Sequence, residues 1–332
     1  MGDAFLPAVI DASIRVGIAV AAVEWGTRRV RRSAPAIAHR LWLLVLSMAL
    51  ALPIGSALVR PVAYVHPAGT LALLLPESVS YPPTLVRVLA GVYMAGTLIL
   101  LARLAIGLHL VALLVRRARP LAPSDVSQLA SSSDGSSRAR RVEFLETSSI
   151  SIPVTTGFAR PRVLLPAEWR EWPIDRLRAV VRHERAHVDR GDYVAGLVSA
   201  FIQAALWFHP AIWLAGRRLS LCAELACDLR ASDGAPADVY ARHLLALEQG
   251  RSPFMPVWSV GAGTRLAERI AALLEPNSSE SRSPCRRVIA CCALIAALLA
   301  ATPLRIVPLR WRSAHASIPY GVPAHQLHSH SH

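Results

Sequence analysis

The sequence contains no lysine and has few charged residues of either sign. Its 36 positive side chains are therefore all arginines, and with 22 acidic residues they give a formal net charge of +14 at pH 7. Charged residues make up 17% of the 332 residues and hydrophobic residues 53%, whereas about a quarter of a soluble domain is normally charged. This balance argues against an ordinary soluble domain and indicates a membrane protein with a modest water-exposed part.

Cysteine is also scarce, and its positions argue against two kinds of structural site. The five cysteines are Cys222, Cys227, Cys285, Cys291 and Cys292, and no two of them form a CxxC pair. Their spacing excludes a zinc ribbon and argues against a disulfide framework. We expect them to be small buried side chains.

Four segments are apolar enough to cross a bilayer, which takes about 20 residues of helix. They lie at residues 5–25, 41–59, 85–115 and 288–307. Arginines cluster between the first two segments and directly after the third, so the positive-inside rule places both regions in the cytoplasm. The arginines thus have a role in topology, and we expect no direct binding of nucleic acid.

These segments predict a mainly α-helical, polytopic membrane protein. Its expected parts are an N-terminal membrane domain with three spans (1–115), a cytoplasmic block (116–285), a last span (286–308) and a short extracytoplasmic tail (309–332).

Within the cytoplasmic block the residue pattern changes several times. Residues 121–141 are polar and rich in serine, which predicts a loop or mobile linker. Short β-type runs follow in 142–166, where 154–156 and 162–165 predict a hairpin. Apolar residues then recur at helical spacing, so we expect a helix over 173–192.

The stretch HERAH within that helix has the HExxH pattern of zinc hydrolases. His183 and His187 are four residues apart, so both imidazoles project from one face and can reach one zinc ion. Glu184 follows the first histidine, where a carboxylate can take the proton of a metal-bound water and pass it to the leaving amine. The alternative is an amphipathic helix with two exposed histidines and no metal.

A catalytic zinc ion needs a third protein ligand, and four residues downstream are candidates. Asp189 and Asp192 follow too closely on the same helix, and His209 lies at an expected helix break. Glu224 lies in a helical stretch and shares a face with Asp228, one turn further on. Glu224 could then bind the metal while the carboxylate of Asp228 orients a ligating histidine. We therefore expect Glu224 to be the third ligand.

This choice constrains the apolar segment between the two halves of the site. Residues 193–215 could pass for a further span, but His187 and Glu224 would then lie on opposite sides of the bilayer, about 30 Å apart. Pro210 cannot continue the hydrogen bonding of a preceding helix and offers a turn. We therefore predict a re-entrant or membrane-skimming helical hairpin over 193–228.

With these residues in view, the chain resembles the BlaR/MecR-type membrane zinc metallopeptidases (metallopeptidase family 56), the family of the β-lactam sensor-transducers. The resemblance is carried mainly by SIPVTTGFARPRVLLP (151–166), HERAHVDRGDY (183–193), WFHPAIW (207–213), ELACD (224–228) and RLAERIAALLE (265–275), with two further stretches, 34–53 and 92–111, in the membrane domain. It implies a gluzincin-like α+β zinc protease domain inserted before the last span.

The resemblance also implies roles for single residues. Zn²⁺ would be bound by His183, His187 and Glu224, with Glu184 as the catalytic base. Packing roles, or contacts that support these residues, are implied for Arg190, Asp192 and Asp228.

The function implied by the resemblance is that of a zinc endopeptidase in the bacterial inner (cytoplasmic) membrane, with its protease domain in the cytoplasm. Such a protein acts in signal transduction as an antirepressor, cleaving a winged-helix transcriptional repressor or itself. Besides that protein substrate, the expected partners are membrane lipid and a separate sensor protein. The roughly 25 residues after the last span cannot hold a penicillin-binding domain with its serine site, so we do not expect this chain alone to sense β-lactams.

Two other interpretations stay open. The chain could be a non-catalytic receptor or scaffold whose zinc is structural or lost, although such a site would not need Glu184. It could also be a quality-control protease for membrane proteins, with the same chemistry and a different substrate.

Overall fold

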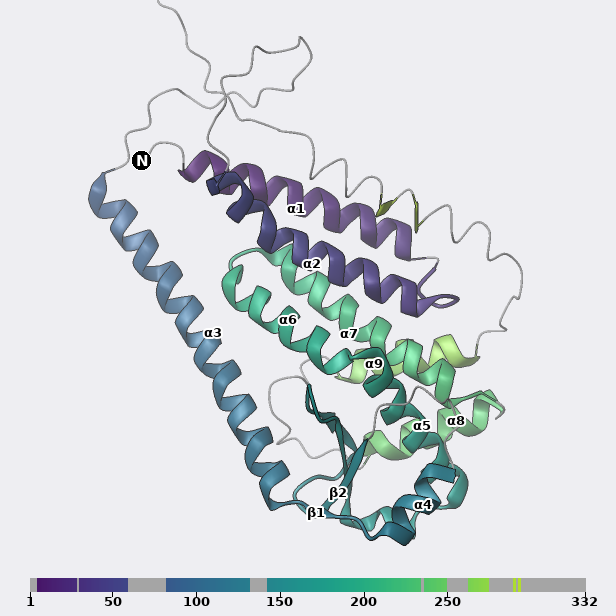
Figure 1. Cartoon of the computed structure of the whole chain (residues 1–332). Helices are drawn as coiled ribbons and strands as arrows, with labels where there is room; N and C mark the ends of the chain where they lie inside the picture. The colour runs from purple at the N-terminus through teal and green to yellow at the C-terminus, as the bar shows by residue number, and fades with distance from the viewer. Residues whose placement is uncertain are drawn as a thin grey trace, which may run out of the picture.

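The computed structural model describes residues 5–28, 30–58, 82–131, 142–233, 236–249, 262–274, 289–290 and 292–293. They form a mostly helical protein with one small sheet (Figure 1), which confirms the expected mainly α-helical class. The helices are α1 (Phe5–Thr27), α2 (Pro35–Leu58), α3 (Pro83–Arg117), α4 (Pro123–Ser131), the 3-10 helix η1 (Ala167–Glu171), α5 (Ile174–Arg190), α6 (Asp192–Ala205), α7 (Pro210–Ala231), α8 (Ala237–Gln249) and α9 (Ala262–Leu274). The strands are β1 (Arg119–Pro120), β2 (Glu143–Thr147), β3 (Val154–Thr156) and β4 (Arg162–Pro166).

Helices α1, α2, α6 and α7 lie side by side and share one apolar core (Figure 1). Along α1 the buried residues Val16, Val20 and Val23 recur every three or four positions, as one face of a helix requires. Trp42 of α2 and Ile212 of α7 are fully buried in the same core. Close packing of these side chains holds the four helices together.

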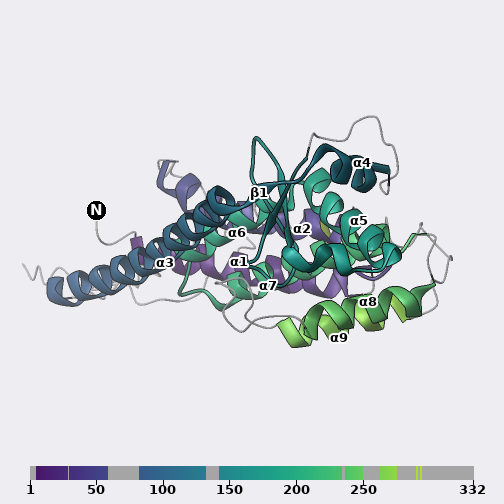
Figure 2. The same cartoon turned by 90° about the horizontal axis from the view of Figure 1, so that it is seen from below.

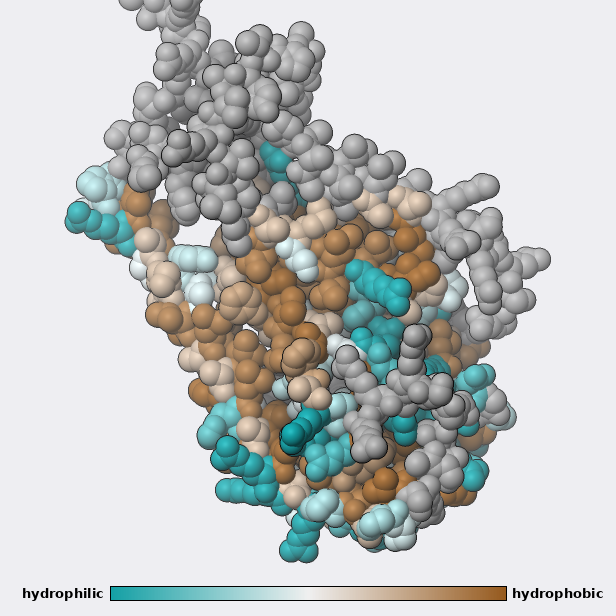
Figure 3. Space-filling model, in the orientation of Figure 1, coloured by the Kyte–Doolittle hydropathy of each residue, from teal (hydrophilic) through white to brown (hydrophobic). Residues whose placement is uncertain are grey.

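Helix α3 lies at the side of this bundle next to α6, and none of its residues is buried (Figure 1). Among the described residues it is the one helix both long and apolar enough to cross a membrane. The apolar stretches in α2 (Pro35–Ala51) and α6 (Asp192–Ala205) are shorter. Apolar side chains cover much of α3 and of the bundle on the face seen in Figure 3, and polar ones gather toward the lower end. That more than one helix crosses the membrane stays a prediction.

The sheet lies at the lower end of the molecule, with strand order β1-β2-β4-β3. Strand β2 pairs in parallel with β4, and β3 pairs antiparallel with β4, with Thr155 opposite Val163. The expected hairpin is therefore present, and β3 is an edge strand among the described residues. Helix α5 packs Leu177 and Val181 against Val163 and Leu165 of the sheet.

Helices α8 and α9 lie side by side along one edge of the molecule, as Figure 2 shows. Tyr240 and Leu244 of α8 pack with Leu266 and Leu273 of α9 and with Ala231 of α7. The last two helices are thereby fixed to the end of α7.

Part of the polar stretch that was expected to be a loop is helical. Residues 123–131 form α4, with Pro123 at its start and Asp125 in its first turn, where proline and an acidic side chain are favourable. Leu129 is fully buried and Val126 packs beside it in the core under the sheet. The packing of Leu129 and Val126 thus stabilises a short helix in a stretch whose high serine content predicts a loop.

Two expected segments lie outside the described residues. They are the tail (309–332) and the last span (286–308), of which only residues 289–290 and 292–293 are described.

A close contact joins α3 to the turn between α6 and α7. Tyr93 donates a hydrogen bond from its hydroxyl to the Ala205 carbonyl (3.0 Å), and the Trp207 indole donates to the Tyr93 carbonyl (3.3 Å). Gly96 lies under the indole ring, so that a Cβ at this position would meet Trp207 carbon atoms at 2.5 Å.

We therefore expect Gly96→Ala to destabilise the protein by about 1–3 kcal/mol, because a rigid ring must shift to admit the methyl group. The measurement is the thermal unfolding temperature of the purified chain in detergent. Gly91→Ala is the matched control on the same helix, since a Cβ there meets no atom within 4 Å. Equal unfolding temperatures for the two variants would show that α3 does not pack on Trp207.

Candidate metal centre

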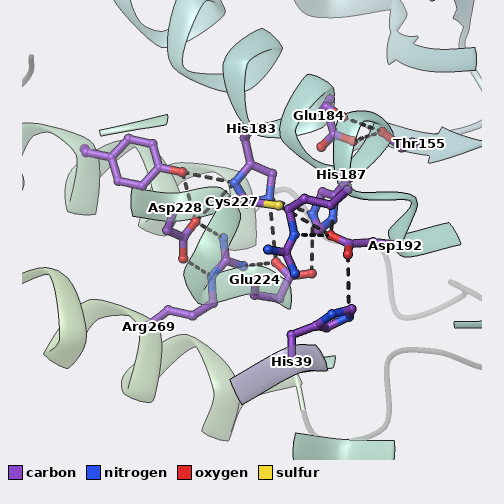
Figure 4. Close-up of polar contacts among 12 residues, drawn as sticks. His39, Thr155, His183, Glu184, His187, Asp192, Glu224, Cys227, Asp228 and Arg269 are labelled. Carbon is purple, nitrogen blue, oxygen red and sulfur yellow. Dashed lines mark hydrogen bonds and ion pairs between the residues drawn. The ribbon is translucent and has the colours of Figure 1, made fainter. Parts of the chain in front are cut away.

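Helix α5 presents His183 and His187 of the HExxH stretch on the face that packs toward α7. The apolar residues Leu177, Val181 and Val188 hold another face of the helix against the sheet core. The Nε2 atoms of His183 and His187 lie 3.1 Å apart (Figure 4). Two imidazole nitrogens therefore converge on one point.

Two chain reversals bring Glu224 to the same point. The first is at Gly191, whose φ of 71° lies in the left-handed region that glycine adopts at low cost. The second is at His209, whose side chain accepts a hydrogen bond from the Ala211 N–H and so caps α7 at Pro210. Along the returning helix, Glu224 Oε2 lies 3.7 Å from Nε2 of His183, and Oε1 lies 3.8 Å from Nε2 of His187.

The other three candidates for a third ligand lie elsewhere or face a different atom. Asp189 forms an ion pair with Arg230 at 2.8 Å. His209 is at the far turn, with Nε2 3.0 Å from the Ser13 carbonyl oxygen. Asp192 contacts Nδ1 of His187, the nitrogen on the opposite side of the ring from the converging atoms.

The donor set fits a zinc ion. Four tetrahedral ligands at about 2.0–2.1 Å stand roughly 3.3 Å from one another, and the donor atoms of His183, His187 and Glu224 lie within 4.8 Å of one another. Two neutral imidazoles and one carboxylate are the protein ligands of several catalytic zinc sites, which keep the fourth position open.

A second group, His187, Asp192 and Cys227, also has its polar atoms within 4.8 Å. Burial, followed by the charge of Asp192, raises the pKa of the Cys227 thiol well above its usual range. The thiol donates a hydrogen bond to Oδ2 of Asp192 at 3.6 Å, and the same oxygen contacts Nδ1 of His187. These contacts lie on the side of the His187 ring away from the converging donors.

A network of three side chains supports His183. Its Nδ1 lies 3.1 Å from Asp228 Oδ1 and 3.2 Å from the Tyr240 hydroxyl, which donates to the same carboxylate at 2.9 Å. Arg269 donates to both oxygens of Asp228 at 2.7 Å (Figure 4). Burial alone would lower the pKa of His183, but hydrogen bonds to Asp228 and Glu224 outweigh it and raise the pKa to about 10. A metal ion that binds Nε2 must therefore displace a proton.

Asp192 supports His187 in the same way. Its Oδ2 lies 2.8 Å from His187 Nδ1 and accepts a hydrogen bond from Arg190 Nε at 3.1 Å, while His39 of α2 lies 3.5 Å from the other oxygen. Burial opposes ionisation of Asp192, but the hydrogen bond to His187 and the charge of Arg190 keep its pKa below the usual value. Both histidines thus have a carboxylate on Nδ1, which leaves Nε2 free to bind a metal.

Glu184 lies between the histidines and the edge of the sheet. Its Oε2 accepts a hydrogen bond of 2.6 Å from the Thr155 hydroxyl on β3 (Figure 4). The side chain is 9% exposed and lines a cavity of about 720 Å³ together with His183, His187 and Glu224. A carboxylate that can exchange a proton therefore shares one cavity with the converging donors.

That cavity extends well beyond the metal-binding residues. Its lining includes Leu104 and Val111 of α3 and Leu197 of α6. The edge strand β3 contributes Val154 and Thr156. An extended peptide could lie along these mainly apolar walls and reach Glu184.

Four side chains of the site lay outside the sequence analysis: His39, Thr155, Tyr240 and Arg269. Thr155, His39 and Arg269 lie in stretches that carry the family resemblance, which was the available signal for them. Tyr240 is an ordinary aromatic residue in an amphipathic stretch, and its role depends on the packing of α8.

Two comparisons with known proteins bear on the family of the chain. A family model described as BlaR1 peptidase M56 matches residues 7–273. Over 79 residues the chain is 28% identical to the "Regulatory protein BlaR1" of Bacillus licheniformis. This stretch is 24% of the present chain and spans only 13% of the length of that relative.

Proposed function

The chain belongs to the BlaR1 peptidase M56 family, and on this premise we propose that it is a zinc metalloendopeptidase of a bacterial membrane that acts at the cytoplasmic face. The observation that carries the proposal is the convergence of His183, His187 and Glu224 from two helices, with Glu184 in the same cavity. A structural metal site would not need that fourth side chain. A non-catalytic scaffold is therefore the weaker interpretation.

Each residue then has a defined task. His183, His187 and Glu224 would hold Zn²⁺, which when bound polarises the scissile carbonyl and lowers the pKa of water. Glu184 takes a proton from the attacking water and passes it to the leaving amine. Thr155 holds the carboxylate of Glu184 toward the cavity through its 2.6 Å hydrogen bond. Asp228 and Asp192 keep each imidazole in the orientation that presents Nε2.

The membrane arrangement is supported by the position of the α6–α7 hairpin. The turn at His209 contacts Ser13 of α1, and Ser13 lies fourteen residues before the end of α1 at Thr27. At 1.5 Å per residue this is a length of about 21 Å along α1. If α1 crosses the bilayer with Thr27 at the cytoplasmic surface, the hairpin enters about two thirds of the roughly 30 Å hydrocarbon layer and returns. Such a path supports the re-entrant hairpin that we propose over 193–228.

The depth of the metal centre follows from α2. His39, which contacts Asp192, is four residues from the start of α2 at Pro35, about 6 Å along the helix. Arg28 and Arg31 adjoin this end of the bundle, where the positive-inside rule places the cytoplasm. The centre would then lie close to the cytoplasmic surface, between the membrane domain and the sheet.

For substrate and partners we propose a role in signalling. A protein substrate, a winged-helix transcriptional repressor or the chain itself, would be cut at the membrane surface, and a separate sensor protein would supply the signal. The support is the family, one member of which is named as a regulatory protein. The parts proposed are the membrane domain (1–115), the protease domain (116–285), the last span (286–308) and the tail (309–332).

Metal removal tests this proposal. We expect the chain purified in detergent to contain about one zinc ion, and a chelator such as 1,10-phenanthroline to abolish its cleavage of a candidate winged-helix repressor. Added Zn²⁺ should restore cleavage, because the metal supplies the activated water. Cleavage that persists in metal-free protein, or a purified chain that binds no zinc, would contradict the proposal.

A further inference from the structure

Arg269 of α9 connects two acidic residues of the metal centre, and sequence analysis assigned it no role. We propose that Arg269 is a positioning residue that fixes Glu224 and Asp228 relative to the two histidines. The inference rests on the proposed zinc centre and assigns a role to a side chain that does not itself bind the metal.

The contacts of Arg269 are divided between the two carboxylates. Its Nε and Nη2 donate to the two oxygens of Asp228, each at 2.7 Å, and its Nη1 lies 2.9 Å from Oε2 of Glu224. A planar guanidinium with fixed donors thus sets the angle between two carboxylates one turn apart on α7. Lysine, a point charge on a flexible chain, cannot make all three contacts in this geometry.

This arrangement fixes the orientation of the Glu224 carboxylate. Arg269 engages Oε2, which lies 3.7 Å from Nε2 of His183, and Oε1 lies 3.8 Å from Nε2 of His187. Without the guanidinium the two carboxylates would repel each other at helical i, i+4 spacing. Glu224 would then lose its preferred orientation, and Asp228 would lose the partner that holds it against His183 Nδ1.

Burial makes these contacts more than surface ion pairs. The side chain of Asp228 is 1% exposed and that of Arg269 is 13% exposed. A buried carboxylate without its cationic partner is costly, so the pair behaves as one unit. Leu266 and Leu273 hold α9 against Tyr240 of α8, so Arg269 projects from an anchored helix.

The neighbouring residue on α9 provides a matched control. Glu268 also forms ion pairs, with Arg31 at 3.8 Å and Arg218 at 3.7 Å, but among the described residues it has no contact with the metal-binding side chains. Its side chain is 44% exposed. Glu268→Gln therefore removes charge from the same helix and leaves the support of Glu224 intact.

The experiment measures the Zn²⁺ affinity of the full-length chain in detergent by competition with a chromophoric chelator at fixed pH. We expect Arg269→Gln to weaken zinc binding about 10- to 100-fold, the usual effect of removing a group that orients a metal ligand. Arg269→Lys should recover only part of the loss. Glu268→Gln should change the affinity less than about threefold, because exposed ion pairs contribute little.

Circular dichroism and the unfolding temperature of the metal-free variants separate positioning from folding. Folded Arg269→Gln protein with unchanged zinc affinity overturns the inference, and so does an equal loss in Glu268→Gln. Failure of the unaltered chain to bind zinc would instead refute the proposed function. If Arg269→Gln does not fold, full affinity in Arg269→Lys overturns the inference and reduced affinity supports it.

Discussion

Replacing Glu184 by glutamine is expected to lower proteolysis by about 10²- to 10⁴-fold while leaving zinc bound. The loss is the usual contribution of a general acid–base residue, since glutamine keeps the shape of the side chain but cannot exchange a proton. Zinc should remain because the three proposed ligands are unchanged and Glu184 makes its contact with Thr155 instead. The measurements are the rate of repressor cleavage, the rate of self-cleavage and the zinc content of the same preparation.

Thr155→Val should lower the rate of cleavage for a related reason, but by a smaller factor. Valine keeps the β-branched shape that suits β3 but removes the hydroxyl that donates to Glu184 at 2.6 Å. Cleavage should fall less than in Glu184→Gln, because the base is still present but is less well oriented. Unchanged cleavage in Glu184→Gln would leave the scaffold interpretation as the better one.

Replacing Glu224 by alanine should have the other large effect, the loss of tight zinc binding. The change removes one of the three proposed protein ligands and one of the two carboxylates that Arg269 contacts. Removing a group that only orients a ligand already weakens metal binding about 10- to 100-fold, so we expect loss of the ligand itself to weaken zinc binding by at least about 100-fold. The measurement is the same chelator competition, together with the zinc content after dialysis.

Asp189→Ala is the control for this prediction, because Asp189 was a rejected candidate for the third ligand. Its carboxylate pairs with Arg230 on α7 at 2.8 Å and lies outside the converging donor set. We expect the affinity for zinc to be unchanged in this variant. A loss in Asp189→Ala with full affinity in Glu224→Ala would mean that the third ligand has been assigned to the wrong residue.

Sequence reasoning brought candidate site residues together where their proximity depends on local spacing. His183 and His187 stand together because any helix places residues i and i+4 on one face. Asp228 could be paired with Glu224 for the same reason, and the structure brings Asp228 within 3.1 Å of His183 Nδ1. The serine-rich composition of residues 121–141 predicts a loop or mobile linker, whereas residues 123–131 form helix α4. Two apolar positions gave too weak a helical pattern to outweigh that composition.

Contacts between distant segments were not accessible in this way. His39 lies 3.5 Å from Asp192, and Arg269 contacts Glu224, which is 45 positions earlier in the sequence. The residues around His39 and Arg269 form no local pattern that identifies these partners. Such pairs depend on the packing of α2 and α9 against the α6–α7 hairpin. A single sequence carries no direct record of that packing.

The amino-acid sequence by itself therefore determined the long apolar helices, helix α5, the turn at Pro210 and the candidate donors, because these depend on spacing and on the fixed geometry of the backbone. Only the tertiary structure decided which nitrogen of each histidine is held by a carboxylate, which oxygen of Glu224 is engaged, and which helices surround the site. Those features depend on contacts of about 3–4 Å between atoms that only the folding of the whole chain brings together. A shift of one helix by a single turn, about 5.4 Å, is longer than these contacts and would remove them.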